Sequence, residues 1–204
     1  MRAAELLREF ASGEAAPAAG SAAALTGALA AALVQMVATL TVEKADGGSE
    51  RLRVRYGPYR SRAQEIATAA GDLQVELEIL VQADAEGVEA LVRLRKQGEP
   101  VGPAVLRSAV DVPLRIARAA VLVAEYGEEL LAQGYRSAAG DADVAARLAF
   151  SAAEGAVAIA DANLAASPGA EAGAPNADQE SRVLHDRLSA LRKRRPQPDH
   201  SPSD

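Results

Sequence analysis

The sequence predicts an all-α fold, a bundle of five to seven helices with a long Ala-rich central helix. Hydrophobic residues make up 49% of the 204 residues but aromatic residues only 3%, so the core must be built from Ala, Leu and Val. That composition favours helix. No stretch alternates apolar and polar residues with a period of two, as a half-buried strand does. An uncharged, Ala-rich run from Ala22 to Val42 is typical of a helix that lies inside a protein.

The N-terminal third is expected to contain two helices and a break. Residues 3–11 carry apolar side chains on one side and predict a short amphipathic helix. Ser21 suits the N-cap of the long buried helix, which is expected to run to about Lys44. Gly47–Ser49 break the chain, and Arg51–Tyr59 is basic and is predicted to be irregular.

Three more helices are expected in the body of the chain. Helical periodicity runs from about Arg60 to Lys96 and again from Ala104 to Gln133. Pro113 lies inside the second of these and should kink the helix or split it in two, since proline removes a backbone hydrogen bond. The last core helix is predicted over Asp141–Ala166.

These elements are assigned to one domain with a C-terminal extension. Residues 1–167 are expected to form the helical-bundle domain. A linker is expected over 168–176 and a terminal amphipathic helix over 177–195. The Pro/Ser/Asp-rich tail, 196–204, is expected to be disordered.

Composition and charge exclude several function classes. The net charge of −6 argues against nucleic-acid binding, which needs a surplus of Lys and Arg for phosphate contacts. The chain has no Cys, and therefore no thiolate chemistry. His185 and His200 are its only histidines, so neither a His-based metal site nor a Ser-His-Asp triad is expected.

The uncharged run is long enough to span a membrane. Its apolar content is modest, however, because it is rich in Ala and contains Thr and Gln35. A signal peptide is not expected either, because Glu5, Glu9 and Glu14 precede the run. We therefore expect a soluble, cytoplasmic protein that does not insert into a membrane.

A series of short motifs, in a defined order, resembles the cyclodeaminase/cyclohydrolase family of folate enzymes. In chain order they are Ala15–Ser21, Leu25–Thr41, Asp84-Ala85, Val112–Leu114, Gly140–Ala146 and Asn163-Leu164. Each motif alone consists of common residues, but their order and spacing extend from the first loop to the end of the last core helix.

This resemblance implies one-carbon chemistry on a tetrahydrofolate substrate, without a further cofactor, in a homodimer. Hydrolysis of 5,10-methenyltetrahydrofolate to 10-formyltetrahydrofolate is the main expectation, because the chain lacks the transferase domain to which the cyclodeaminase can be fused. The alternatives are cyclodeamination of 5-formiminotetrahydrofolate, with loss of ammonia, and a non-catalytic folate-binding or dimerisation module.

Two carboxylates are candidates for the catalytic group. A cationic amidinium carbon needs a carboxylate that stabilises the cation and accepts a proton. Asp141 is the first choice: it lies at a predicted helix start, where the helix dipole keeps it ionised, although it could equally be an ordinary N-cap. Asp84 lies in mid-helix among apolar residues, and it either points into a polar pocket or is exposed beside Glu86.

Four residues are expected to bind substrate. Gly20 and Ser21 precede a row of free backbone N–H groups, which suit anions or polar ligand groups, while Ser21 could also only cap its helix. Lys44 could reach a carboxylate or be a solvated helix end. Asn163 could bond a pterin edge or a neighbouring backbone group. The basic segment Arg51–Arg62 is a further candidate, for the anionic tail of a folate.

The enzyme and the non-catalytic module predict different surroundings for Ser21. An enzyme should bury Asp141 or Asp84 beside Ser21 in a cleft, whereas a module without chemistry should fill that space with Ala and Leu. Ala18 and Ala19 favour the second arrangement, because members of the family have glycine there and a methyl group obstructs close ligand approach.

Overall fold

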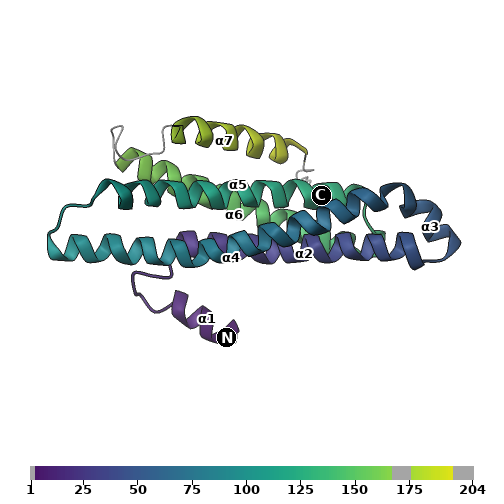
Figure 1. Cartoon of the computed structure of the whole chain (residues 1–204), viewed down its shortest axis with the longest axis horizontal. Helices are drawn as coiled ribbons and strands as arrows, with labels where there is room; N and C mark the ends of the chain where they lie inside the picture. Colours follow the sequence, from purple (N-terminus) through teal and green to yellow (C-terminus); the bar gives the residue numbers. More distant parts are fainter. Residues whose placement is uncertain (1–2, 167–175, 195–204) are drawn as a thin grey trace, which may run out of the picture.

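Helices form all the regular structure of residues 3–166 and 176–194, which are the residues that the computed structural model describes (Figure 1). They are α1 Ala3–Phe10, α2 Ala19–Gly47, α3 Glu50–Tyr56, η1 Gly57–Tyr59, α4 Arg60–Gln97, α5 Pro103–Gln133, η2 Arg136–Ala138, α6 Ala139–Ala166 and α7 Ala177–Arg194. The predicted all-α fold is therefore confirmed. The expected tail, 196–204, lies outside the described residues. So does the expected linker, 168–176, except for Asn176.

The Ala-rich helix α2 is the centre of the bundle, as predicted. It packs against α4, α5 and α6, and α5 in turn packs against α6 (Figure 1). Its buried positions are almost all small, with Ala24, Ala30 and Ala31 fully buried. Small side chains let three helices approach one central helix closely, which explains how a core with few aromatic residues is filled.

The contact between α5 and α6 depends on a glycine. A Cβ atom at Gly127 of α5 would lie 2.9 Å from the Cβ atom and 3.0 Å from the Cα atom of Ala146 in α6. Those distances are shorter than van der Waals contact, and the second atom belongs to the backbone. The absence of a side chain at Gly127 thus sets how closely the two helices approach.

The basic segment after α2 is helical, so the prediction of an irregular stretch over Arg51–Tyr59 is wrong. The backbone carbonyl of Ser49 accepts hydrogen bonds from the N–H groups of Leu52 (2.8 Å) and Arg53 (2.9 Å) and so starts α3. Tyr56, which is 3% exposed, anchors the helix to the bundle. Arg53 and Arg55 lie in its last turn, where cations complement the helix dipole.

Two helices start earlier than predicted. α2 begins at Ala19, so Ser21 is its third residue and not its cap; Ala18 takes the N-cap position without a side-chain hydrogen bond. α6 begins at Ala139, so Asp141 is likewise the third residue of its helix. α5 runs unbroken through Pro113 from end to end.

The C-terminal helix α7 packs on α5 and α6. Its buried residues Leu184, Leu188 and Leu191 belong to the same hydrophobic core as the rest of the bundle. Arg187 of α7 also forms an ion pair with Glu125 of α5, at 2.6 Å. The helix therefore extends the bundle core past α6.

Two helical segments are long and apolar enough to cross a membrane by length and composition, Ala19–Gly47 and Arg136–Ala166. In the first of these helices, half of the most apolar stretch is buried inside the bundle. The central helix of a soluble bundle has the same length and composition, because it must be apolar on most of its sides.

Replacing Gly127 with Ala is expected to destabilise the protein by about 1 to 3 kcal/mol, because the new methyl group overpacks the α5–α6 contact. Urea unfolding followed by circular dichroism measures the change. Gly155→Ala is the matched control, since a Cβ atom there meets nothing within 4 Å. It should stabilise α6 by up to about 1 kcal/mol. Equal effects at the two glycines would contradict this account of the packing.

Candidate functional site

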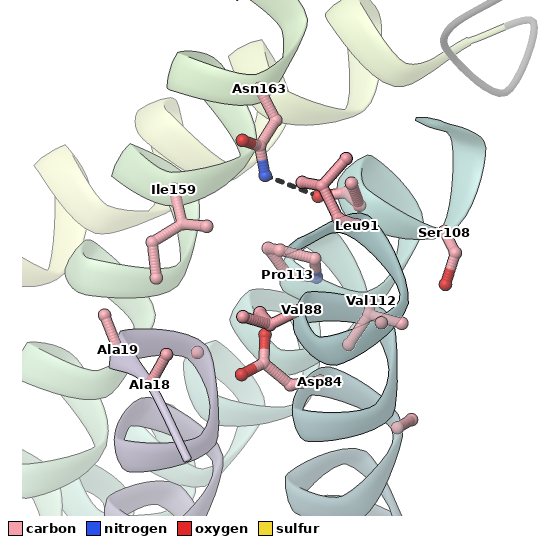
Figure 2. A pocket seen from close by; sticks show the side chains of 14 residues that line it. Ala18, Ala19, Asp84, Val88, Leu91, Ser108, Val112, Pro113, Ile159 and Asn163 are labelled. Carbon is pink, nitrogen blue, oxygen red and sulfur yellow. Dashed lines mark hydrogen bonds between the residues drawn. The ribbon is translucent and has the colours of Figure 1, made fainter. Parts of the chain in front are cut away.

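A cavity of about 180 Å³ lies where the start of α2 meets α4, α5 and the C-terminal half of α6 (Figure 2). Its lining is mostly apolar. The residues are Ala18, Ala19, Gly20, Ala83, Asp84, Gly87, Val88, Leu91, Ser108, Ala109, Val112, Pro113, Ile159 and Asn163. Three of the predicted site residues, Gly20, Asp84 and Asn163, thus come together from three different helices.

Asp84 is the ionisable group of this cavity and is only 8% exposed. Its Oδ2 atom accepts two hydrogen bonds from Ser21, one from the backbone N–H at 2.6 Å and one from the hydroxyl at 2.7 Å. Ser21 is therefore neither a cap nor a lining residue: it holds the carboxylate. The anion expected at the start of the long helix is a side chain of the chain itself, supplied by α4.

The other carboxylate oxygen of Asp84, Oδ1, accepts no hydrogen bond from the residues that the structure describes. Figure 2 shows the carboxylate turned from α4 toward Ala18 and Ala19 at the start of α2. A Cβ atom at Gly20 would lie 2.0 Å from Oδ1, so only glycine leaves room for the carboxylate. A buried carboxylate oxygen without a partner can bind a cation or an N–H donor at low cost in desolvation.

Asn163 replaces the backbone hydrogen bond that Pro113 removes from α5. Proline has no backbone N–H, so the carbonyl of Ala109, four residues earlier, lacks its helical partner. The Nδ2 atom of Asn163 in α6 donates a hydrogen bond to that carbonyl at 2.6 Å (Figure 2). Of the two alternatives for Asn163, the structure thus has the bond to a neighbouring backbone group, and the residue also lines the cavity.

Asp141 and Lys44 lie at the opposite end of the bundle. Asp141 is exposed in the first turn of α6, 22 residues before Asn163, which corresponds to roughly 33 Å along a helix. Lys44 lies 23 residues after Ser21 on α2, or roughly 35 Å, and its ammonium is 5.5 Å from the centre of the Tyr135 ring. Within the single chain the structure does not bring either residue to the cavity.

The two arginines at the end of the basic segment Arg51–Arg62 are held in ion pairs, away from the cavity. Arg60 forms a bidentate pair with Asp46, at 2.9 Å for each pair of atoms. Arg62 binds Glu129 through two nitrogens, at 2.9 and 2.8 Å. These charges are neutralised by the chain's own carboxylates.

Tyr59 completes this second polar cluster, because its hydroxyl donates to Glu129 at 3.0 Å. Arg62 and this hydroxyl hold the pKa of Glu129 below its ordinary value, the bond from Arg62 being the larger cause. Burial, followed by the bond to Glu129, raises the pKa of Tyr59 well above its ordinary value. The cluster ties η1 and α4 to α5.

Sequence reasoning missed Gly87, Ser108 and Ile159, which also line the cavity. No motif marks them, but helical spacing could have found two of them, since Gly87 lies three residues after Asp84 on α4 and Ile159 four residues before Asn163 on α6. Ser108 reaches the cavity through the packing of α5 against the other helices. Among the described residues, no three His, Cys, Asp or Glu side chains gather in a way that could hold a metal ion.

Comparisons with known proteins agree with the resemblance seen in the sequence. A family model described as formiminotransferase-cyclodeaminase matches residues 2–173. The crystal structure of formiminotetrahydrofolate cyclodeaminase from Thermotoga maritima has a TM-score of 0.78 to this chain at 23% sequence identity. The match covers 95% of this chain and 93% of that one and shows a shared fold. No curated protein matches the sequence significantly.

Ser21→Ala is expected to lower the free energy of unfolding by about 1.5 to 3 kcal/mol, because it removes a buried hydrogen bond to a charged acceptor. Urea unfolding measures the loss. Thr26→Ala, on the same helix, is the control, since the Thr26 hydroxyl donates to the neutral carbonyl of Ala22. A loss at Ser21 no larger than the loss at Thr26 would show that the contact with Asp84 does not stabilise the fold.

Proposed function

The chain belongs to the formiminotransferase-cyclodeaminase family, and from this premise we propose that it closes 5-formiminotetrahydrofolate to 5,10-methenyltetrahydrofolate with release of ammonia. The observation that carries the proposal is the Oδ1 atom of Asp84, which accepts no hydrogen bond from the described part of the chain and lies at the edge of a mostly apolar cavity. The substrate and the product both carry their positive charge on an amidinium carbon, which a buried carboxylate stabilises.

The proposed reaction needs one proton transfer and no change of oxidation state. The N10 atom of the substrate attacks the protonated formimino carbon, and a bond forms between them. N10 gives up its proton, the former imino nitrogen gains one, and the bond from the carbon to that nitrogen breaks as ammonia leaves. The methenyl carbon then bridges N5 and N10 and keeps the positive charge. Atoms and charge balance without a further cofactor.

Asp84 is suited to both parts of this reaction. Its negative charge faces the cation across an apolar cavity, where electrostatic attraction is stronger than in water. Its Oδ1 atom is free to accept the proton of N10 and to return it to the leaving nitrogen. The two hydrogen bonds from Ser21 hold Oδ2, so the carboxylate keeps its orientation while Oδ1 acts.

Hydrolysis of the methenyl cation to 10-formyltetrahydrofolate is the second candidate reaction, because the same carboxylate could activate a water molecule toward the same carbon. The apolar lining favours the attack by N10, which needs no water. A non-catalytic module is supported less well. Its prediction, a space beside Ser21 filled by Ala and Leu, differs from the observed cavity with Asp84 at its edge.

We also propose that the protein is a cytoplasmic homodimer whose two copies pack through the outer face of α2. That face carries Leu29 and Met36, two turns apart, which are 56% and 39% exposed in the single chain. Leu33 and Leu40 beside them are partly buried against the core. Exposed large apolar side chains on the central helix are typical of a surface that a second copy covers.

The Asp84→Asn variant is expected to release ammonia from 5-formiminotetrahydrofolate roughly 10²- to 10⁴-fold more slowly than the wild type. Coupled ammonia detection and methenyl absorbance measure the rate. The amide oxygen can still accept both bonds from Ser21, so the fold should survive, and circular dichroism checks this. Asp72→Asn, an exposed change on the same helix, should leave the rate unchanged.

Three results would change the proposal. Full activity in the Asp84→Asn variant would remove Asp84 from the mechanism. If activity were lost in the Asp141→Asn variant instead, the Asp141 carboxylate would be the catalytic group. Loss of methenyltetrahydrofolate absorbance without any ammonia release from the formimino substrate would favour hydrolysis. No turnover of either substrate by the wild type would leave the non-catalytic module.

The double variant Leu29→Glu/Met36→Glu is expected to be monomeric, since two buried charges would oppose packing of α2 against a second copy. Light scattering after gel filtration without detergent measures the mass. Val54→Glu is the control, because Val54 is 73% exposed on α3. A wild-type monomer, or a dimer that survives the double variant, would contradict this interface. A wild type that needs detergent would indicate a membrane surface.

A further inference from the structure

A second cavity, shallow and open to solvent, of about 400 Å³, lies between the loop before α2 and the C-terminal part of α4. Its lining residues are Ala15, Glu89, Val92, Arg93, Lys96 and Gln97. Unlike the cavity beside Asp84, this one combines an apolar wall with an excess of one positive charge, since two cations face one carboxylate.

The cations of this second cavity are available to a ligand. Arg93 and Lys96 are exposed, and neither forms an ion pair or a side-chain hydrogen bond with the residues that the structure describes. Arg60 and Arg62 of the basic segment, by contrast, are already paired with Asp46 and Glu129. An anionic group that binds near the start of α2 therefore finds its free cations on the last turns of α4.

The two cavities are neighbours along one helix and one loop. Leu91 lines the first and Val92, the next residue of α4, lines the second, while the loop contributes Ala18 to one and Ala15 to the other. Lys96 lies twelve residues after Asp84, which corresponds to roughly 18 Å along the axis of α4. One elongated ligand can thus occupy both.

A folate has the chemistry that this pair of cavities would take. The first cavity, at about 180 Å³, is smaller than pockets that enclose a whole ligand of that size, which measure roughly 300 Å³ or more. We propose that the one-carbon end of the substrate lies at Asp84 while its aminobenzoyl ring crosses Val92 and its glutamate carboxylates bind Arg93 and Lys96. This inference rests on the function proposed above.

The test compares two stable ligands that differ only in the glutamate. Calorimetry measures the affinity of the full chain for 5-formyltetrahydrofolate and for 5-formyltetrahydropteroate, which lacks that residue. The wild type should bind the folate at least about fivefold more tightly than the pteroate, because two exposed charge pairs contribute about that much affinity. High salt should reduce the difference between the two affinities, since it screens exposed charges. In Arg93→Ala/Lys96→Ala the two affinities should become equal, with the affinity for the pteroate unchanged.

Two variants serve as controls. Arg93→Lys/Lys96→Arg keeps both charges and should keep the preference for the folate. Arg182→Ala/Lys193→Ala removes two exposed cations from α7 and should also keep it. Equal affinities in the wild type would overturn the glutamate site while leaving a role for Asp84. Binding of neither ligand would overturn the proposed function and this inference together.

Discussion

The two hydrogen bonds from Ser21 to Asp84 are the contact on which the site depends. They join the start of the central helix α2 to the middle of α4, and they are possible because Gly20 has no side chain. Farther along the same pair of helices, a Cβ atom at Gly27 would lie 3.2 Å from a methyl group of Leu77. The Asp84 carboxylate thus accepts hydrogen bonds from the start of α2 and fixes the register of α2 against α4. Its Oδ1 atom, which the described residues leave without a hydrogen bond, lies at the cavity.

This arrangement also explains why alanine fits at the start of α2. Ala18 and Ala19 line the cavity without filling it. At Gly20, by contrast, a Cβ atom would collide with the carboxylate. The need for glycine at Gly20 therefore comes from the chain's own Asp84, whereas Gly13, farther back in the loop, is glycine at a positive φ of 81°.

The fold class could be predicted from the sequence because Ala-rich composition and helical periodicity are local properties. The site could be predicted only in part. Ser21 was expected to cap its own helix, but its acceptor, Asp84, comes from 63 positions away in the sequence. Asp141 and Lys44 were expected at the site from the resemblance alone, and the order of motifs along a chain does not tell which end of a long helix faces the cavity. The uncharged run from Ala22 to Val42 was likewise expected to lie inside the protein, but the bundle leaves one face of α2 partly exposed, at Leu29 and Met36.

A crystal structure of the protein with bound 5-formyltetrahydrofolate would show directly whether Asp84 meets the substrate. We expect the one-carbon end of the ligand to lie within hydrogen-bond distance of Asp84 Oδ1, with the hydrogen bonds from Ser21 to Oδ2 intact. A ligand bound instead at the far end of the bundle, beside Lys44 and Asp141, would contradict this expectation.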